Sequence, residues 1–93
     1  MHVRLVRFSV AVGSTNAADA VRANVLPTIR TQDGLQSVTF FGSEDEGEYG
    51  IAIFWETERH ANAAAKVVGP KLAAALENEV TGPPDIRLFP VIE

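Results

Sequence analysis

The chain has 93 residues, of which 46% are hydrophobic and 22% charged, and a formal net charge of −4. This composition is typical of a globular protein and excludes disorder, and the length leaves room for one hydrophobic core, so we expect a single domain over residues 1–93. The chain has no cysteine, which excludes disulfides, a thiolate nucleophile and cysteine metal sites.

The distribution of charge also limits the partners. Basic residues are scattered, whereas four of the twelve acidic residues lie within residues 44–48. Nucleic-acid binding requires clustered Lys and Arg that displace counterions from phosphates, so we predict no nucleic-acid partner. No apolar run approaches the ~18 residues of a membrane span and no leader pattern is present, so we expect no membrane contact and a cytoplasmic location.

Alternating apolar and polar positions over residues 1–12 predict a first strand. Side chains alternate between the faces of a strand, so Arg4 and Arg7 fall on opposite faces, and the sequence leaves open which of them faces inward. Residues 13–16, Gly-Ser-Thr-Asn, end the strand and cap a helix that has Asp19 in its first turn.

One apolar stripe, with spacings of three, four and four residues, predicts this first helix: Ala18, Val21, Val25 and Ile29. Pro27 has no N–H to donate to the carbonyl of Ala23, so we expect a kink or a break near Leu26. Gly34 suits the left-handed position that follows the end of a helix.

Two strands are predicted over residues 35–42 and 48–56, joined as a hairpin by the acidic, glycine-containing segment. Thr57 is the predicted N-cap of a second helix, with Glu58 in its first turn. The apolar stripe of that helix keeps its phase across Gly69 and Pro70, so we expect one kinked helix: Ala61, Ala64, Ala65, Val68, Leu72, Ala75 and Leu76.

The last strand is predicted over residues 86–93. Pro90 indicates either that this strand lies at an edge of the sheet or that it ends near this residue. The element order is therefore βαββαβ. This order predicts an α+β, ferredoxin-like sandwich in which two helices cover one face of a four-stranded antiparallel sheet.

The third strand is apolar on both of its faces. Tyr49, Ile51, Ile53 and Trp55 alternate with Gly50, Ala52 and Phe54. Because two helices cover only one face of the sheet, an apolar second face is expected to pack against another subunit. We therefore predict a homodimer of two-fold symmetry in which sheet packs against sheet.

The chain resembles the antibiotic-biosynthesis-monooxygenase (ABM) domain of the dimeric α/β-barrel group over residues 1–92. The matching features are Gly34-Leu35 at the start of the second strand, Phe54-Trp55-Glu56 at the end of the third, and the alanine-rich helix that follows. The resemblance implies a dimeric α/β barrel with a cleft between sheet and helices in each subunit. It also implies oxidation of polyketide-like anthrones or quinols by O₂ without a cofactor, so the partner is a hydrophobic aromatic small molecule.

Another branch of the family binds and degrades haem, which the resemblance leaves as an alternative cofactor. That branch has an asparagine on the first strand and an axial histidine in the middle of the second helix. Here the first strand has no asparagine, and His60 falls in the first turn of the helix. We therefore expect no cofactor.

The resemblance assigns one residue to the cleft, Trp55, whose N–H would orient a ligand oxygen; the alternative is a tryptophan of the core or of the dimer interface. His60 lies at the flank of the helix stripe, where it is either a base at the rim of the cleft or a surface histidine. We take Trp55 and His60 as candidate catalytic residues.

Four further residues are candidates for substrate binding: Arg4, Arg7, Tyr49 and Phe54. An inward arginine needs a carboxylate or an anionic ligand, and together with Tyr49 it would bind a phenolate or a carboxylate. The alternative is a salt bridge at the end of the strand. His60 has no ligand partner one helical turn away, so we predict no metal.

Two rival functions follow from the same order of elements. RNA-recognition motifs share it, but their third strand carries stacking aromatics where this chain has Ile51 and Ile53. A dimer that binds a small ligand without catalysis is the stronger rival. It is favoured by the small number of polar groups available to an apolar pocket.

Overall fold

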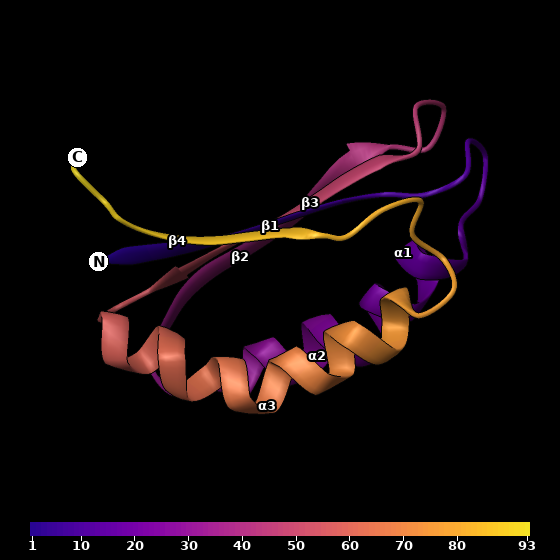
Figure 1. The fold of residues 1–93 in the computed structure, drawn as a ribbon. Helices are drawn as coiled ribbons and strands as arrows, with labels where there is room; N and C mark the ends of the chain where they lie inside the picture. Colours follow the sequence, from indigo (N-terminus) through magenta and orange to yellow (C-terminus); the bar gives the residue numbers. More distant parts are fainter.

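A computed structural model describes residues 1–93. The elements follow in the order β1 (His2–Ser9), α1 (Asn16–Ala20), η1 (Val21–Val25), α2 (Leu26–Arg30), β2 (Leu35–Ser43), β3 (Glu48–Trp55), α3 (Glu58–Leu76) and β4 (Asp85–Pro90). The four strands form one antiparallel sheet in the order β2-β3-β1-β4. The predicted ferredoxin-like sandwich is confirmed. Figure 1 shows all the helices on one side of the sheet and the two termini at the same end.

The core lies between the sheet and the helices, and strand alternation decides which side chains reach it. Val6 of β1 lies opposite Ile51 of β3 and Ile86 of β4, so all three share the face that looks toward the helices. Val6 and Ile51 are 2% and 1% exposed, whereas Ile86, on the edge strand β4, is 49% exposed. The helices therefore cover β1 and β3 more completely than β4.

The first helical segment is interrupted at the predicted place. Val21–Val25 form a π-helical turn in which the N–H of Leu26 donates to the carbonyl of Val21, five residues back. Pro27 lacks an N–H and is accommodated in the first turn of α2, where no donor is needed. The π turn thus absorbs the missing donor and keeps Val25 and Ile29 buried.

Helix α3 is a single helix that contains Pro70, as expected from the unbroken stripe. It begins at the predicted cap, where the hydroxyl of Thr57 accepts from the N–H of His60 at 3.1 Å. One residue of the stripe is placed differently: Ala65 is exposed, because it lies at the margin of the buried face.

Three predicted boundaries were wrong by more than one residue. β1 ends at Ser9, because its ladder with β4 ends at Arg7 and its ladder with β3 ends at Ser9, and Val12 is 73% exposed. β4 starts at Asp85 and ends at Pro90, which cannot donate to a ladder. Gly34 has a positive φ of 82°, but it lies in the turn before β2, while α2 is capped at Thr31.

The second face of the sheet carries no helix and is apolar at one end. Val3 of β1 lies opposite Phe54 of β3 and Phe89 of β4 on this face. Phe89 is 43% exposed, and Val3 and Phe54 are half-buried. Nearer the other end, the ring of Phe41 lies over Gly50, where an added Cβ would come within 2.3 Å of it.

Candidate functional site

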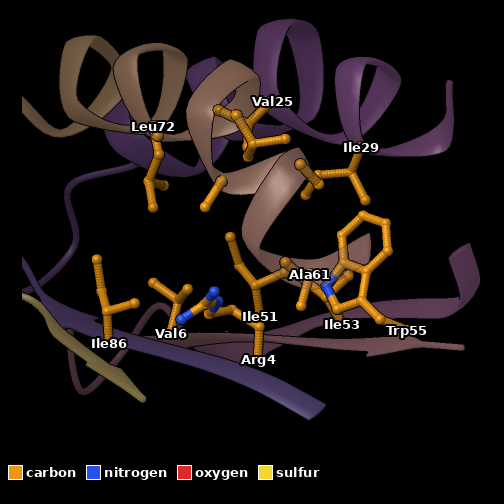
Figure 2. A pocket seen from close by; sticks show the side chains of 14 residues that line it. Arg4, Val6, Val25, Ile29, Ile51, Ile53, Trp55, Ala61, Leu72 and Ile86 are labelled. Atoms are coloured by element: carbon orange, nitrogen blue, oxygen red, sulfur yellow. The ribbon is translucent and has the colours of Figure 1, made fainter. Parts of the chain in front are cut away.

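A partly enclosed cavity of about 140 Å³ lies between the sheet and the helices. Its floor is β1, β3 and β4, and its roof is η1, α2 and α3 (Figure 2). Twelve of the fourteen lining residues are hydrophobic. Engineered apolar cavities of about 150 Å³ bind a molecule the size of benzene, so this one accommodates a single aromatic ring.

The space between α3 and the sheet is not filled, because α3 presents alanines, which have small side chains, to the sheet. Ala61, Ala64 and Ala65 line the cavity from this helix, and their methyl groups are too short to reach the sheet. The hollow is therefore a consequence of the alanine-rich stretch that follows Trp55 in the sequence.

Trp55 forms one wall of the cavity. Its side chain is 2% exposed and lies on the inner face of β3, at the strand end next to α3. The indole N–H has no hydrogen-bond partner in the chain, and it is not among the polar atoms sealed from solvent. In Figure 2 the indole nitrogen points toward the interior of the cavity. The wall of the cavity therefore offers one free donor.

The structure decides between the two arginines. Arg4 lies opposite Ile53 and Leu88 on the inner face of the sheet and lines the cavity. Its Nη2 donates to Oδ1 of Asn62 on α3 over 3.2 Å. Arg7 lies on the other face, is exposed and lines a separate polar depression.

The remaining candidates lie outside the cavity. Tyr49 is on the inner face of β3, but at the opposite end from Trp55, where it stacks on Phe8 and Phe40. Phe54 faces the uncovered side of the sheet. The structure thus brings Trp55 together with Arg4, and places Tyr49, Phe54 and Arg7 elsewhere. The roles predicted for these residues remain predictions.

His60 faces away from the cavity. Its ring packs on Gly34, where an added Cβ would come within 2.2 Å of it, and its Nδ1 lies 2.8 Å from the Thr57 hydroxyl. It lines a shallow depression with Gln32, Asp33 and Arg59. The cavity and this depression share only Ala64 among their lining residues. His60 therefore does not reach a ligand held beside Trp55 in this structure.

Asn62 was not predicted as a site residue, since an exposed helix position explains an asparagine without any function. It is 58 residues from Arg4 in the chain. No sequence pattern brings these two side chains together, and only the packing of α3 over β1 does so.

A groove of about 650 Å³ continues the cavity between α3 and β4. The two share three lining residues, Gly69, Leu72 and Ile86. Because α3 covers β4 incompletely, a ligand larger than one ring has an apolar path out of the cavity along this groove.

The residues that line the cavity are not suited to bind a metal ion or haem iron. No group of three or more His, Cys, Asp or Glu side chains in the chain is placed to hold a metal. Haem iron needs an axial His, Cys, Met or Tyr, and none of these lines the cavity. The residues of this site therefore do not fit haem.

None of the helices is long and apolar enough to cross a bilayer.

No protein-family model and no curated protein matches the sequence. Solved structures match it over nearly its whole length. A Nitrosomonas europaea protein provisionally named an antibiotic biosynthesis monooxygenase has a TM-score of 0.82 at 19% identity, with 100% of both chains covered. The chain has the ABM fold. The ABM resemblance predicted from the sequence is confirmed, and at this identity the likeness establishes the architecture rather than the chemistry.

Two further ABM-fold structures have named activities. SnoaB of Streptomyces nogalater, a cofactor-independent oxygenase, has a TM-score of 0.78 at 21% identity, covering 99% of this chain and 93% of SnoaB. The ActVA-Orf6 monooxygenase of Streptomyces coelicolor, in complex with nanaomycin D, has a TM-score of 0.75 at 26% identity, covering 95% and 84%. This chain is therefore similar in fold to a cofactor-independent oxygenase and to a monooxygenase that was solved with a bound small-molecule ligand.

Proposed function

We propose that this ABM-like domain is a cofactor-independent monooxygenase that oxidises an aromatic, polyketide-like small molecule such as an anthrone or a quinol. The observation that carries the proposal is the apolar cavity walled by Trp55, whose free N–H points inward. Its support from other proteins is the shared fold with SnoaB and ActVA-Orf6, which are named as oxygenases.

The size of the cavity defines how such a substrate fits. A volume of about 140 Å³ holds one ring, so the reacting ring of a polycyclic compound lies beside Trp55. The other rings lie in the groove along Leu72 and Ile86. The apolar walls exclude water from the part of the reacting ring that lies deepest in the cavity, which strengthens electrostatic interactions there.

For an anthrone, the proposed reaction converts a ring CH₂ and O₂ into a ring ketone and water. The CH₂ loses a proton to water at the opening of the cavity, and the resulting carbanion, whose charge is shared with the ring oxygen, adds O₂. After a proton returns, the hydroperoxide loses water and leaves the ketone, so the substrate itself supplies the electrons. The Trp55 N–H donates a hydrogen bond to the oxygen on which negative charge develops.

The alternative is a ligand-binding protein of the same fold without catalysis. What favours it is the small number of polar groups, since only Arg4 and Trp55 among the lining residues have polar side chains. Both functions use the same cavity, so turnover distinguishes them and binding does not.

We propose further that residues 1–93 act as one domain in a cytoplasmic homodimer. The support is the apolar end of the uncovered sheet face, where Val3, Phe54 and Phe89 form a row across three strands. An exposed apolar surface of this kind is normally covered in a soluble protein. We expect a mass in solution of twice the 10.0 kDa of one chain, and a stable monomer contradicts the proposal.

O₂ consumption with anthrone and quinol substrates tests the activity. We expect turnover by the wild type and, for Trp55→Phe, a fall in kcat of about 100-fold, since the loss of one oxyanion donor costs roughly that much. Phenylalanine keeps the apolar wall and removes only the N–H. Tyr49→Phe is the matched control, because Tyr49 lies outside the cavity. No turnover on any of these substrates, or equal rates for both variants, overturns the proposal.

A further inference from the structure

The cavity contains one charge. Arg4 is the only ionisable residue among the fourteen that line it, and it lies between two apolar side chains of the neighbouring strands, Ile53 and Leu88. It is half-buried, so part of its hydration is lost. A cation in such surroundings is normally matched by a carboxylate.

No carboxylate matches it here. The three ion pairs of the molecule join other residues. The single hydrogen bond from the Arg4 side chain goes to the neutral amide oxygen of Asn62 at 3.2 Å, longer than the ~2.7–2.9 Å of a charge-assisted bond. A guanidinium has five N–H donors, so most of its donor capacity is free for a ligand.

The other polar side chain of the lining is also a donor. The indole N–H of Trp55 has no partner in the chain and faces the cavity (Figure 2). All other lining residues are Val, Ile, Leu, Ala or Gly, whose side chains carry no acceptor. The side chains of the cavity therefore supply one positive charge and two groups that donate hydrogen bonds. They complement a ligand whose polar atoms are negatively charged or only accept hydrogen bonds.

We infer that Arg4 binds the acidic oxygen of an aromatic ligand and holds that ligand as its anion, a phenolate, an enolate or a carboxylate. The inference rests on the proposed function and defines its substrate class. The positive charge favours the ionised form, so it lowers the pKa of a bound phenol or enol. No lining side chain can act as a general base, so the proton leaves to water at the opening of the cavity, and Arg4 assists this step by making the bound ligand more acidic.

Spectroscopic titration with 4-nitrophenol tests this directly, since its phenolate is coloured and it ionises near neutral pH. We expect the wild type to bind the phenolate at least tenfold more tightly than the phenol, which corresponds to a fall of about one in the pKa of the bound probe. Arg4→Met keeps most of the apolar stem and removes the charge. We expect it to abolish that preference and to weaken phenolate binding at least tenfold.

Two controls separate the charge from the fold. Arg7→Met removes an arginine of the same strand from the opposite, exposed face, and we expect it to leave the titration unchanged. Nitrobenzene has the ring without the acidic oxygen, and we expect wild type and Arg4→Met to bind it equally.

Asn62→Ala removes the hydrogen-bond partner of the Arg4 guanidinium. We expect this variant to bind the phenolate as tightly as the wild type or more tightly.

Equal pKa values for the free and the bound probe, no binding of the probe, or equal effects of the two arginine substitutions overturn the inference. The measurement needs no turnover. A protein that binds the phenolate through Arg4 but consumes no O₂ confirms the anion site and contradicts the oxygenase. A protein whose Arg4→Met variant consumes O₂ as fast as the wild type does the reverse.

Discussion

The two ends of β3 use the same inner face of the sheet in opposite ways. At one end Tyr49 stacks between Phe8 and Phe40, with ring centroids 5.6 and 5.8 Å apart, and side chains fill the space. At the other end Trp55 faces the alanines of α3, and a cavity of about 140 Å³ remains. Both aromatic residues are buried, at 9% and 2% exposure.

This difference shows that burial of an aromatic residue does not by itself indicate a site. Tyr49 and Trp55 lie on the same strand and the same face, and both have an amphipathic aromatic side chain. What separates them is the volume of the side chains that they meet: aromatic rings at one end and methyl groups at the other. We therefore expect the filled end to contribute stability, and the proposed ligand site lies at the hollow end.

Removal of an aromatic ring from the filled end is the largest expected effect. Phe8 is 3% exposed and stacks on Tyr49, so Phe8→Ala leaves a void in a filled region. We expect the free energy of unfolding to fall by about 3–5 kcal/mol, measured by urea denaturation. At urea concentrations below the onset of unfolding, we expect this variant to bind 4-nitrophenol with the affinity of the wild type. A loss of affinity under these conditions contradicts the division of β3 into a filled and a hollow end.

Filling the hollow end should have the converse effect. Val68 of α3 lines the cavity, and Val68→Phe places a ring in it. We expect at least a tenfold loss of 4-nitrophenol affinity, with a free energy of unfolding equal to or up to about 1.5 kcal/mol above that of the wild type, because the added ring fills a void.

The matched control for that variant is the same substitution at Val21, which is 0% exposed and outside the cavity lining. Insertion into a filled core costs about 1–3 kcal/mol, so we expect Val21→Phe to be destabilised and Val68→Phe not. Equal destabilisation of the two variants contradicts the cavity.

The smallest effect is expected for Tyr49→Phe. The Tyr49 hydroxyl makes no hydrogen bond in the structure, so its removal leaves the ring stack intact. We expect a change in the free energy of unfolding below about 0.5 kcal/mol and unchanged probe affinity. A large loss of affinity would return Tyr49 to the binding site.

Several features followed from the sequence because they depend on neighbours in the chain. The Thr57 cap rests on a hydroxyl three residues from the N–H of His60. The interruption before Pro27 rests on one missing donor. The order of the strands and helices rests on periodicity, and all of these were predicted correctly.

The composition of the site was less accessible. The resemblance singled out Trp55, but it gave no reason to exclude Tyr49 or His60 from the same site. Strand periodicity placed Arg4 and Arg7 on opposite faces without deciding which face the helices cover. The partnership of Arg4 with Asn62 spans 58 residues, and no local rule reaches so far.

By itself, therefore, the sequence determined the fold, the opposed faces of the two arginines and the alanine-rich helix behind Trp55. The tertiary structure alone decided that Arg4 faces the helices, that one end of β3 is filled and that the other is hollow. The physical reason is that periodicity and capping are properties of adjacent residues. A cavity, in contrast, is the volume that remains when side chains from β1, β3, β4 and the helices meet without filling the space between them.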